Sequence, residues 1–224
     1  MMSQAKRSDT IFLWSFLIVG LAVQIVTYII SPHSAISLIC GMLGICSVIL
    51  CSQGRILTYI FGFGQIITYT YICYTESLYG LIGINVYYFV TQIYGIVIWR
   101  KRLKDNNSEL MDVVPTRTLS WKIMLLIVAA IVIVSIITGW LLSTYTDDSQ
   151  PYLDAYTTIP ALVAQILMIL AYREQWFFWF FIDVLYVVLW ARAGDYCLLA
   201  QHVFWCINCV YGYFRWTKAL EPRA

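Results

Sequence analysis

The sequence predicts an all-α, polytopic membrane protein with eight transmembrane helices arranged 1+3+1+3, in which the two groups of three helices are parallel repeats. Three observations support this fold class. The 224 residues are 61% hydrophobic and 12% charged, whereas a soluble domain carries about 25% charged residues. Eight apolar segments approach the length of roughly 20 residues that a helix needs to cross a bilayer. Residues in the two halves of the chain also recur at a constant spacing, as in duplicated carriers.

The first apolar segment stands apart from the duplicated part of the chain. It follows Lys6 and Arg7 and is too long for the core of a secretory signal peptide, so we expect a retained helix. Because it is apolar on nearly every side, we also expect a peripheral span that faces lipid. In chain order, the eight segments cover residues 11–30, 35–52, 56–73, 78–99, 122–142, 157–172, 176–193 and 195–216.

Domain boundaries follow from this order of segments. The extra helix occupies residues 1–34, the first three-helix repeat residues 35–104 and the second repeat residues 157–224. Residues 105–156 hold a cytoplasmic loop, a linker helix and a periplasmic loop. Three spans begin on one side of the membrane and end on the other, so one linker helix returns the chain to the starting side. The two repeats must then insert in the same orientation.

The basic residues predict which side of the membrane each loop occupies. With the N-terminus in the cytoplasm and eight spans, Arg192 is the only one of the 14 Lys and Arg residues on the outside. Cytoplasmic loops carry an excess of Lys and Arg in membrane proteins, so we expect both termini in the cytoplasm. The cytoplasmic residues in this arrangement are Lys6, Arg7, Arg55, Arg100, Lys101, Arg102, Lys104, Arg117, Lys122, Arg173, Arg215, Lys218 and Arg223.

The repeat is clearest at the ends of its two copies. The offset between Tyr94 and Tyr211 is 211 − 94 = 117, and Tyr69 and Tyr186 differ by the same number. The matching ends read Tyr94-Gly95-Ile-Val-Ile-Trp99 and Tyr211-Gly212-Tyr-Phe-Arg-Trp216.

Polar side chains within apolar segments mark the candidate transport pathway, because polar groups in hydrocarbon are costly. Asp183 is the strongest candidate, since its neighbours Ile182 and Val184 are apolar. It could accept hydrogen bonds from a substrate or balance a positive charge, or it could be a structural anchor or simply protonated. The other candidate substrate-binding residues are Gln65, Asn85, Tyr88, Gln92, Trp176, Trp179, Gln201, His202, Trp205 and Asn208.

Each of these residues also has a structural interpretation. Gln65 could bind substrate or join two helices by a hydrogen bond. His202 could couple transport to protons, although a lone histidine is more often structural. Trp176 and Trp179 share a helix face and could stack on a planar ring, or belong to an interfacial aromatic belt.

Two segments resemble the PnuC family of vitamin transporters. They are Gly-Ile-Asn85-Val-Tyr-Tyr-Phe-Val-Thr-Gln92-Ile-Tyr94-Gly95-Ile-Val-Ile-Trp99 and Trp176-Phe-Phe-Trp179-Phe-Phe-Ile-Asp183-Val. The resemblance covers about residues 35–218, and the linker helix matches only in position. The chain departs from the family in its extra first span, which only some members share. It also has Gln65 and Asp183 where other members show Asn on the middle helix of each repeat.

The resemblance implies a fold related to the SWEET sugar carriers and a homotrimer in the bacterial inner (cytoplasmic) membrane. It implies facilitated diffusion of a vitamin that supplies NAD biosynthesis, with phosphorylation inside the cell trapping the substrate. Nicotinamide riboside is the best-known substrate of the family, and related members carry thiamine, riboflavin or deoxynucleosides.

Other classes of protein remain open from the residues alone. An intramembrane enzyme is one, but the sequence has no H-E-x-x-H, G-x-S-x-G or P-loop motif, so we expect no enzyme, catalytic residue or cofactor. A non-transporting membrane subunit is another. Cys206 and Cys209 form a C-x-x-C without a second pair, so packing is expected rather than metal binding. Basic residues confined to short loops argue against a nucleic-acid partner.

Overall fold

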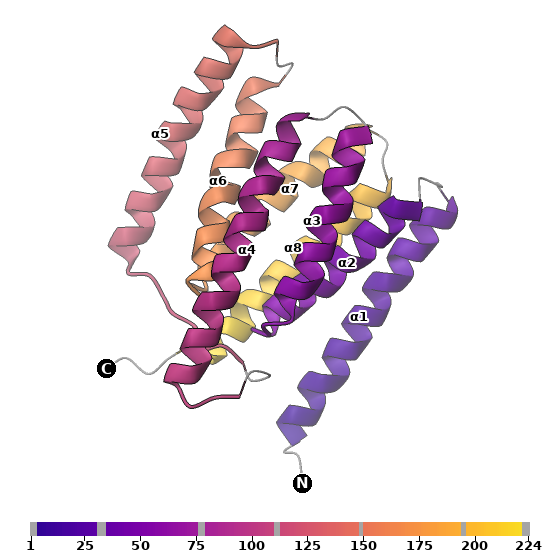
Figure 1. The fold of residues 1–224 in the computed structure, drawn as a ribbon, viewed down its shortest axis with the longest axis vertical. Helices are drawn as coiled ribbons and strands as arrows, with labels where there is room; N and C mark the ends of the chain where they lie inside the picture. Colours follow the sequence, from indigo (N-terminus) through magenta and orange to yellow (C-terminus); the bar gives the residue numbers. More distant parts are fainter. Residues whose placement is uncertain are drawn as a thin grey trace.

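The computed structural model describes residues 4–30, 35–75, 79–109, 113–147, 150–193 and 196–220, and it places eight α-helices in these ranges (Figure 1). Their order matches the eight segments expected from the sequence. The helices are α1 (Gln4–Ile30), α2 (Ala35–Ser52), α3 (Thr58–Thr75), α4 (Tyr79–Asp105), α5 (Trp121–Tyr145), α6 (Pro151–Ile169), α7 (Gln175–Ala193) and α8 (Tyr196–Lys218).

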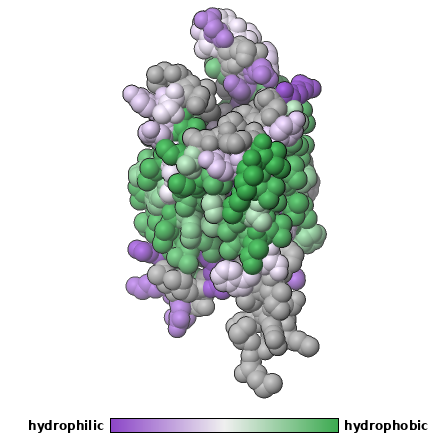
Figure 2. Space-filling view, turned by 90° about the vertical axis from the view of Figure 1, so that its right-hand side faces the viewer, coloured by the Kyte–Doolittle hydropathy of each residue, from purple (hydrophilic) through white to green (hydrophobic). Residues whose placement is uncertain are grey.

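The surface of the bundle has the character of a membrane protein. Figure 2 shows a broad hydrophobic band between two rims that carry hydrophilic residues. Large apolar side chains such as Leu126, Ile60 and Val97 are exposed, where a soluble protein would carry polar residues. Four helices, α2, α4, α5 and α6, are long and apolar enough to cross a membrane by length and composition, and shorter apolar stretches occur in α1 and α7. An all-helical membrane protein is therefore confirmed.

Helix contacts close a ring of six helices in the order α2, α3, α4, α6, α7 and α8, with α8 returning to α2. The two remaining helices lie outside the ring, where α1 packs on α2 and α8, and α5 packs on α6 (Figure 1). The first turn of α1 and the last turn of α8 lie at the same end of the bundle, which we call the lower end. In Figure 1, α2, α4, α6 and α8 run toward this end, and α3 and α7 run away from it.

The first helix is less peripheral than its sequence predicts. One face of α1 is exposed, including Trp14 and Ile18, as expected for a lipid-facing span. The opposite face packs closely, because Phe16 stacks on Phe204 of α8 with ring centroids 4.3 Å apart. Gly20, one turn further along, leaves room for the same ring. The expectation was wrong for this face because most of its residues are themselves apolar, so hydropathy cannot separate lipid from protein contact.

Four aromatic side chains fill the lower end of the ring. Trp99, near the C-terminal end of α4, and Trp216, in the last turn of α8, lie with ring centroids 6.0 Å apart. Tyr59 meets Trp99 edge-on at 5.0 Å, and Trp176 meets Trp216 edge-on at 5.6 Å. These rings are buried and belong to one hydrophobic cluster, which we call the lower aromatic cluster.

The two tryptophans at the centre of this cluster are held by backbone of the opposite half of the chain. The Trp99 Nε1–H donates to the carbonyl of Ile169 on α6 at 3.1 Å. The Trp216 Nε1–H donates to the carbonyl of Cys51 on α2 at 3.0 Å. Both carbonyls lie in the last turn of a helix, where backbone acceptors lack intrahelical partners, and the Cys51 carbonyl also accepts from the Gly54 N–H at 2.8 Å. The indole donor of each half is therefore satisfied by backbone of the other half.

Residues 113–120, between α4 and α5, run across the lower end as a strap. The Val114 N–H donates to the Gly54 carbonyl at 3.0 Å, and the Arg117 N–H donates to the Ala171 carbonyl at 2.8 Å. Gly54 and Ala171 both adopt a positive φ, of 65° and 58°, in the tight connections after α2 and α6. The strap therefore binds the same kind of turn in each half.

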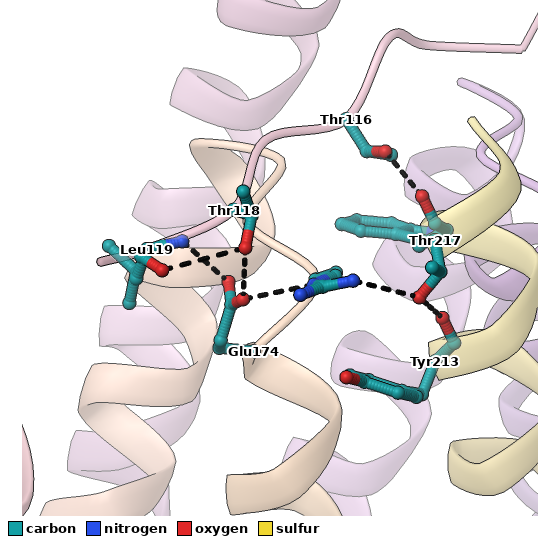
Figure 3. Close-up of polar contacts among 8 residues, drawn as sticks. Thr116, Thr118, Leu119, Glu174, Tyr213 and Thr217 are labelled. Atoms are coloured by element: carbon teal, nitrogen blue, oxygen red, sulfur yellow. Dashed lines mark hydrogen bonds and ion pairs between the residues drawn. The ribbon is translucent and has the colours of Figure 1, made fainter. Parts of the chain in front are cut away.

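A buried carboxylate fixes the second part of the strap (Figure 3). Glu174 accepts hydrogen bonds from the Thr118 hydroxyl at 2.7 Å and from the Leu119 N–H at 3.1 Å. Arg173 contacts the same carboxylate at 3.1 Å and donates to the Thr217 hydroxyl of α8 at 3.3 Å. The strap, the α6–α7 turn and α8 are thereby joined in one polar network.

Helix ends differ from the sequence expectation where helices continue beyond the apolar core. α6 begins at Pro151 rather than residue 157, because proline is well suited to the first position of a helix. α4 continues to Asp105, past the expected end at Trp99, through a basic segment. Hydropathy locates the part of a helix inside lipid, not the polar turns that extend it.

Candidate functional site

Asp183 lies in the middle of α7 and is the carboxylate at the centre of the candidate site. It is 3% exposed, so leaving it unpaired would be costly. His202 of α8 places its Nδ1 atom 2.9 Å from Asp183 Oδ1, and Cys209 of α8 donates to Oδ2 at 3.7 Å. Both carboxylate oxygens are thus engaged by one neighbouring helix.

Aromatic rings enclose this pair on two sides. Tyr186, one turn beyond Asp183 on α7, stacks on the His202 ring with centroids 4.8 Å apart. Trp205, one turn beyond His202 on α8, meets the same imidazole edge-on at 5.1 Å. Helical spacing of three residues places both partners on the face of Asp183 and His202. The result is a carboxylate and an imidazole framed by a phenol and an indole.

The small residues of α2 form a floor on which further polar groups gather. A Cβ atom added to Gly44 would lie 2.9 Å from Gln65 Nε2 of α3 and 3.3 Å from the Trp205 ring. Gln65 and Trp205 therefore meet over the same glycine. Because Trp205 also contacts His202, the amide from the first half lies on the same glycine as a ring that borders the Asp183 and His202 pair.

One turn earlier on α2, Gly41 leaves room for the side chains of two other glutamines. A Cβ atom at Gly41 would lie 2.6 Å from Gln24 Oε1 of α1 and 3.5 Å from Gln201 Oε1 of α8. Gln201 and Gln24 are both buried. Together these residues form the central cluster, which consists of Gln24, Gln65, Asp183, Tyr186, Gln201, His202 and Trp205.

Three other polar residues expected in the pathway are buried but make helix-to-helix contacts. Asn208 donates from Nδ2 to the Val48 carbonyl of α2 at 3.2 Å, while its Oδ1 has no partner among the described residues. Asn85 donates to the Cys73 sulfur of α3 at 3.9 Å. Gln92 lies directly against Gly62 of α3. These positions bridge neighbouring helices of the ring.

Two of the three tryptophans expected in the site lie elsewhere. Trp176 is part of the lower aromatic cluster and packs against Gly212 of α8. Trp179 is half-buried between that cluster and the apolar contact of α5, α6 and α7. Tyr88 lies beside Tyr87 on α4, with ring centroids 5.7 Å apart. Of the tryptophans proposed for the site, Trp205 is the one whose ring contacts His202.

Sequence analysis missed Gln24 and Tyr186 as site residues. Gln24 carries the same signal as Gln65, because it is an amide inside an apolar segment. It was overlooked because the first span lies outside the repeat. Tyr186 was recognised only as the repeat partner of Tyr69, since its contact with His202 depends on the packing of α7 on α8.

The central cluster offers groups that can bind an organic solute. Its ionisable groups include one carboxyl group and one imidazole, and its other members are amides and aromatic rings. Among the described residues, no group of three or more His, Cys, Asp or Glu side chains is arranged to hold a metal ion. Amides that donate and accept, beside rings that can stack, are the groups expected for an organic solute.

Comparison with known proteins agrees with this interpretation. Residues 34–218 match a family model described as nicotinamide mononucleotide transporter. The nicotinamide riboside transporter PnuC of Neisseria mucosa is 34% identical over 92% of this chain and 81% of that protein. The protein of the same name from Haemophilus influenzae is 31% identical over 96% and 92% of the two chains.

A solved structure is similar in fold over nearly the whole chain. The crystal structure of the vitamin B3 transporter PnuC superposes with a TM-score of 0.79 at 33% identity, covering 93% of this chain and 92% of the other. The matched range of 34–218 also agrees with the extent of resemblance expected from the sequence. The chain therefore belongs to the PnuC family of membrane transporters.

Proposed function

We propose that this chain is a facilitative carrier that takes nicotinamide riboside across the bacterial inner membrane. The observation that carries the proposal is the buried Asp183, paired with His202 and framed by aromatic rings inside a helical bundle. Nicotinamide riboside combines a planar pyridinium cation with a carboxamide and ribose hydroxyls, and the central cluster offers a complement to each of these groups.

The positive ring is the part of the substrate that Asp183 recognises. A cation over an indole face gains roughly 0.5–2 kcal/mol, so the ring binds beside Trp205 while the carboxylate balances its charge. Asp183 then exchanges part of its contact with His202 for contact with the substrate. Gln65 and Gln201 donate to and accept from the carboxamide and the ribose hydroxyls.

The charges of the central cluster favour a nucleoside over a nucleotide. A phosphate group needs cationic donors such as Arg or Lys, and the cluster contains neither. Asp183 would also repel the phosphate. Intracellular phosphorylation would therefore convert the substrate into a form that the carrier does not return, which provides the trapping step of facilitated uptake.

We also propose eight membrane spans in the 1+3+1+3 arrangement with parallel repeats, assembled as a homotrimer with both termini in the cytoplasm. Exchange of α2, α3 and α4 with α6, α7 and α8 leaves the contacts of the six-helix ring unchanged, as expected for two equivalent units. Corresponding helices run in the same direction (Figure 1). The lower end is assigned to the cytoplasm because Arg102, Arg117 and Arg173 lie there.

Thiamine is the second candidate substrate, and Asp183 is the specific reason, since it stands where other members of the family show Asn. A carboxylate favours any cationic ring, and thiamine also carries a positive ring. Riboflavin has no such charge, so it should bind more weakly than either cation.

Binding and uptake by the purified protein test the proposal. Titration of the protein in detergent with nicotinamide riboside, thiamine and riboflavin should give the tightest binding for nicotinamide riboside. Proteoliposomes should take up the same substrate unchanged, and collapse of a proton gradient should leave this uptake largely intact. A protein that converts its ligand would be an enzyme, one that moves nothing would be a subunit, and either result would refute a carrier. Loss of uptake without the gradient would instead give His202 or Asp183 a proton-coupling role.

A further inference from the structure

Gln24 is a buried polar residue that the packing of its helix does not explain. It lies in the C-terminal third of α1, between the exposed apolar residues Ile18 and Ile25, and is only 4% exposed. Its Nε2 group is shielded from solvent and has no hydrogen-bond partner among the described residues. Buried amide donors are rarely left without a partner in native proteins, so each such group calls for an explanation.

A second unpaired donor belongs to Trp205. Its Nε1–H is also buried and without a partner among the described residues. Gln24 contacts Gly41 through Oε1, Trp205 contacts Gly44 through its ring, and these two glycines lie on one face of α2. Two side chains that each hold a buried, unpaired N–H donor therefore pack on neighbouring glycines of α2, next to the residues that surround Asp183.

The position of α1 is fixed well enough to hold such a donor in place. Phe16 stacks on Phe204, and Leu17 and Leu21 pack on the buried cluster of Ile45, Ile49 and Phe204. Gln24 follows Phe16 by two helical turns, so it shares the face that α1 presents to α2 and α8. The helix outside the ring thus places an amide among the residues of the ring.

We propose that α1 supplies a substrate-binding residue, in which the Gln24 Nε2 amide donates a hydrogen bond to a neutral oxygen of a substrate bound in the central cluster. The inference deepens the proposed function and rests on it. An uncharged donor suits a hydroxyl or carbonyl oxygen, so the acceptor is a ribose hydroxyl or the carboxamide carbonyl of the nucleoside. The Trp205 Nε1–H donates to the same region and defines the other side of the subsite.

Substitution of Gln24 tests its role. Gln24→Leu keeps the approximate size of the side chain but removes the donor, and Gln24→Met keeps the unbranched chain without an N–H donor. Both variants of the full chain should bind nicotinamide riboside about tenfold more weakly in a calorimetric titration, the loss expected for one hydrogen bond of roughly 1.4 kcal/mol. Thr27→Val is the matched control on the same helix, because the Thr27 hydroxyl already donates to the Val23 carbonyl at 2.9 Å. Its affinity should be unchanged.

Substrate analogues identify the acceptor and separate binding from packing. Analogues that lack one ribose hydroxyl, or that carry methyl in place of the carboxamide, should each be titrated against the wild type and Gln24→Leu. For the analogue that lacks the acceptor, the two proteins should bind equally. An equal loss for every analogue, or wild-type affinity of Gln24→Leu for nicotinamide riboside, would overturn the role of Gln24. Failure of the wild-type protein to bind nicotinamide riboside would instead overturn the proposed function.

Discussion

The two halves of the chain contribute matching residues at the lower end of the bundle but different residues at its centre. At the lower end, residues 117 positions apart occupy matching places, as shown by Trp99 with Trp216 (216 − 99 = 117) and Tyr59 with Trp176 (176 − 59 = 117). At the centre, Asp183 has an apolar counterpart in Ile66 (183 − 66 = 117). The two halves contribute equally to the packing of the lower end, whereas only one half carries the buried carboxyl group.

The symmetric lower end is suited to closing a pathway, and the asymmetric centre is suited to recognising a solute. Two equivalent halves can close one end with equivalent contacts, so both copies of the aromatic pair and of its glycine partner persist. A nucleoside has a charged ring at one side and a sugar at the other, so a site with identical halves would fit it poorly. Asymmetry at Asp183 is therefore expected to set selectivity, and symmetry at the tryptophans is expected to set stability.

The largest effect on uptake should come from removing the Asp183 carboxyl group, which one half of the chain carries and the other lacks. Asp183→Ala should lower uptake of nicotinamide riboside by about 100-fold, equivalent to roughly 2.7 kcal/mol, because the cation and His202 both lose their partner. Uptake by proteoliposomes measures the change. Ile66→Val at the matching position is the control and should retain uptake, since it removes no polar group. Near-normal uptake by Asp183→Ala would show that the carboxylate is structural.

The next effect concerns the glycines that admit the aromatic rings. Gly212→Ala would place a Cβ atom 2.6 Å from the Trp176 ring, and Gly95→Ala would meet the Tyr59 ring in the same way. Each should lower the free energy of unfolding by about 1–3 kcal/mol through overpacking, seen as a lower melting temperature in detergent. Gly83→Ala, also on α4, meets nothing within 4 Å and should be neutral or stabilising. A large difference between Gly95 and Gly212 would contradict the equivalence of the two halves.

A smaller and matched effect is expected at the two central tryptophans. Trp99→Phe and Trp216→Phe each remove one N–H donor to backbone, shared by the Met168 and Ile169 carbonyls for Trp99 and bound to the Cys51 carbonyl for Trp216, which costs about 1 kcal/mol in unfolding free energy. Because the rings are in contact, the double variant should lose less or more than the sum of the two. Thermal unfolding of the single and double variants gives this coupling, and strict additivity would argue against a shared cluster.

The smallest effect should be found in the two tight connections. Ala171 has φ 58° and Gly54 has φ 65°, a region that costs a residue with a Cβ atom roughly 1–2 kcal/mol. Ala171→Gly should therefore raise the melting temperature slightly, offset in part by the greater freedom of glycine in the unfolded chain. Gly54→Ala should lower it. The melting temperature should therefore change in opposite directions at these matched positions. A change in the same direction would show that the positive φ of Ala171 is not a source of strain.

Much of the helical architecture could be predicted because it follows from hydropathy. The eight segments and their order come from runs of apolar residues, and the matching ends come from direct repetition of Tyr-Gly-x-x-x-Trp. The start of α6 at Pro151 could not be found in this way, because the added turn is polar. The buried face of α1 was also missed, since Phe16 has the same hydropathy in lipid as against Phe204.

The site was predictable only as a set of polar residues. Asp183 and His202 were both selected as polar groups in apolar segments, but their contact at 2.9 Å depends on how α7 packs on α8. Trp176 and Trp179 were chosen for stacking, and the structure places Trp176 in the lower aromatic cluster. Helical spacing identifies residues on one face, and it does not say which neighbouring helix that face meets.

The crossed hydrogen bonds of Trp99 and Trp216 have a consequence for leakage. Each tryptophan belongs to one half and is held by a carbonyl of the other, so relative movement of the halves stretches both bonds together. A state with one bond broken and one kept has little reason to be populated. Opening at this end should then be a single concerted step. A partly open state, wide enough for ions but too narrow for the vitamin, should not be populated.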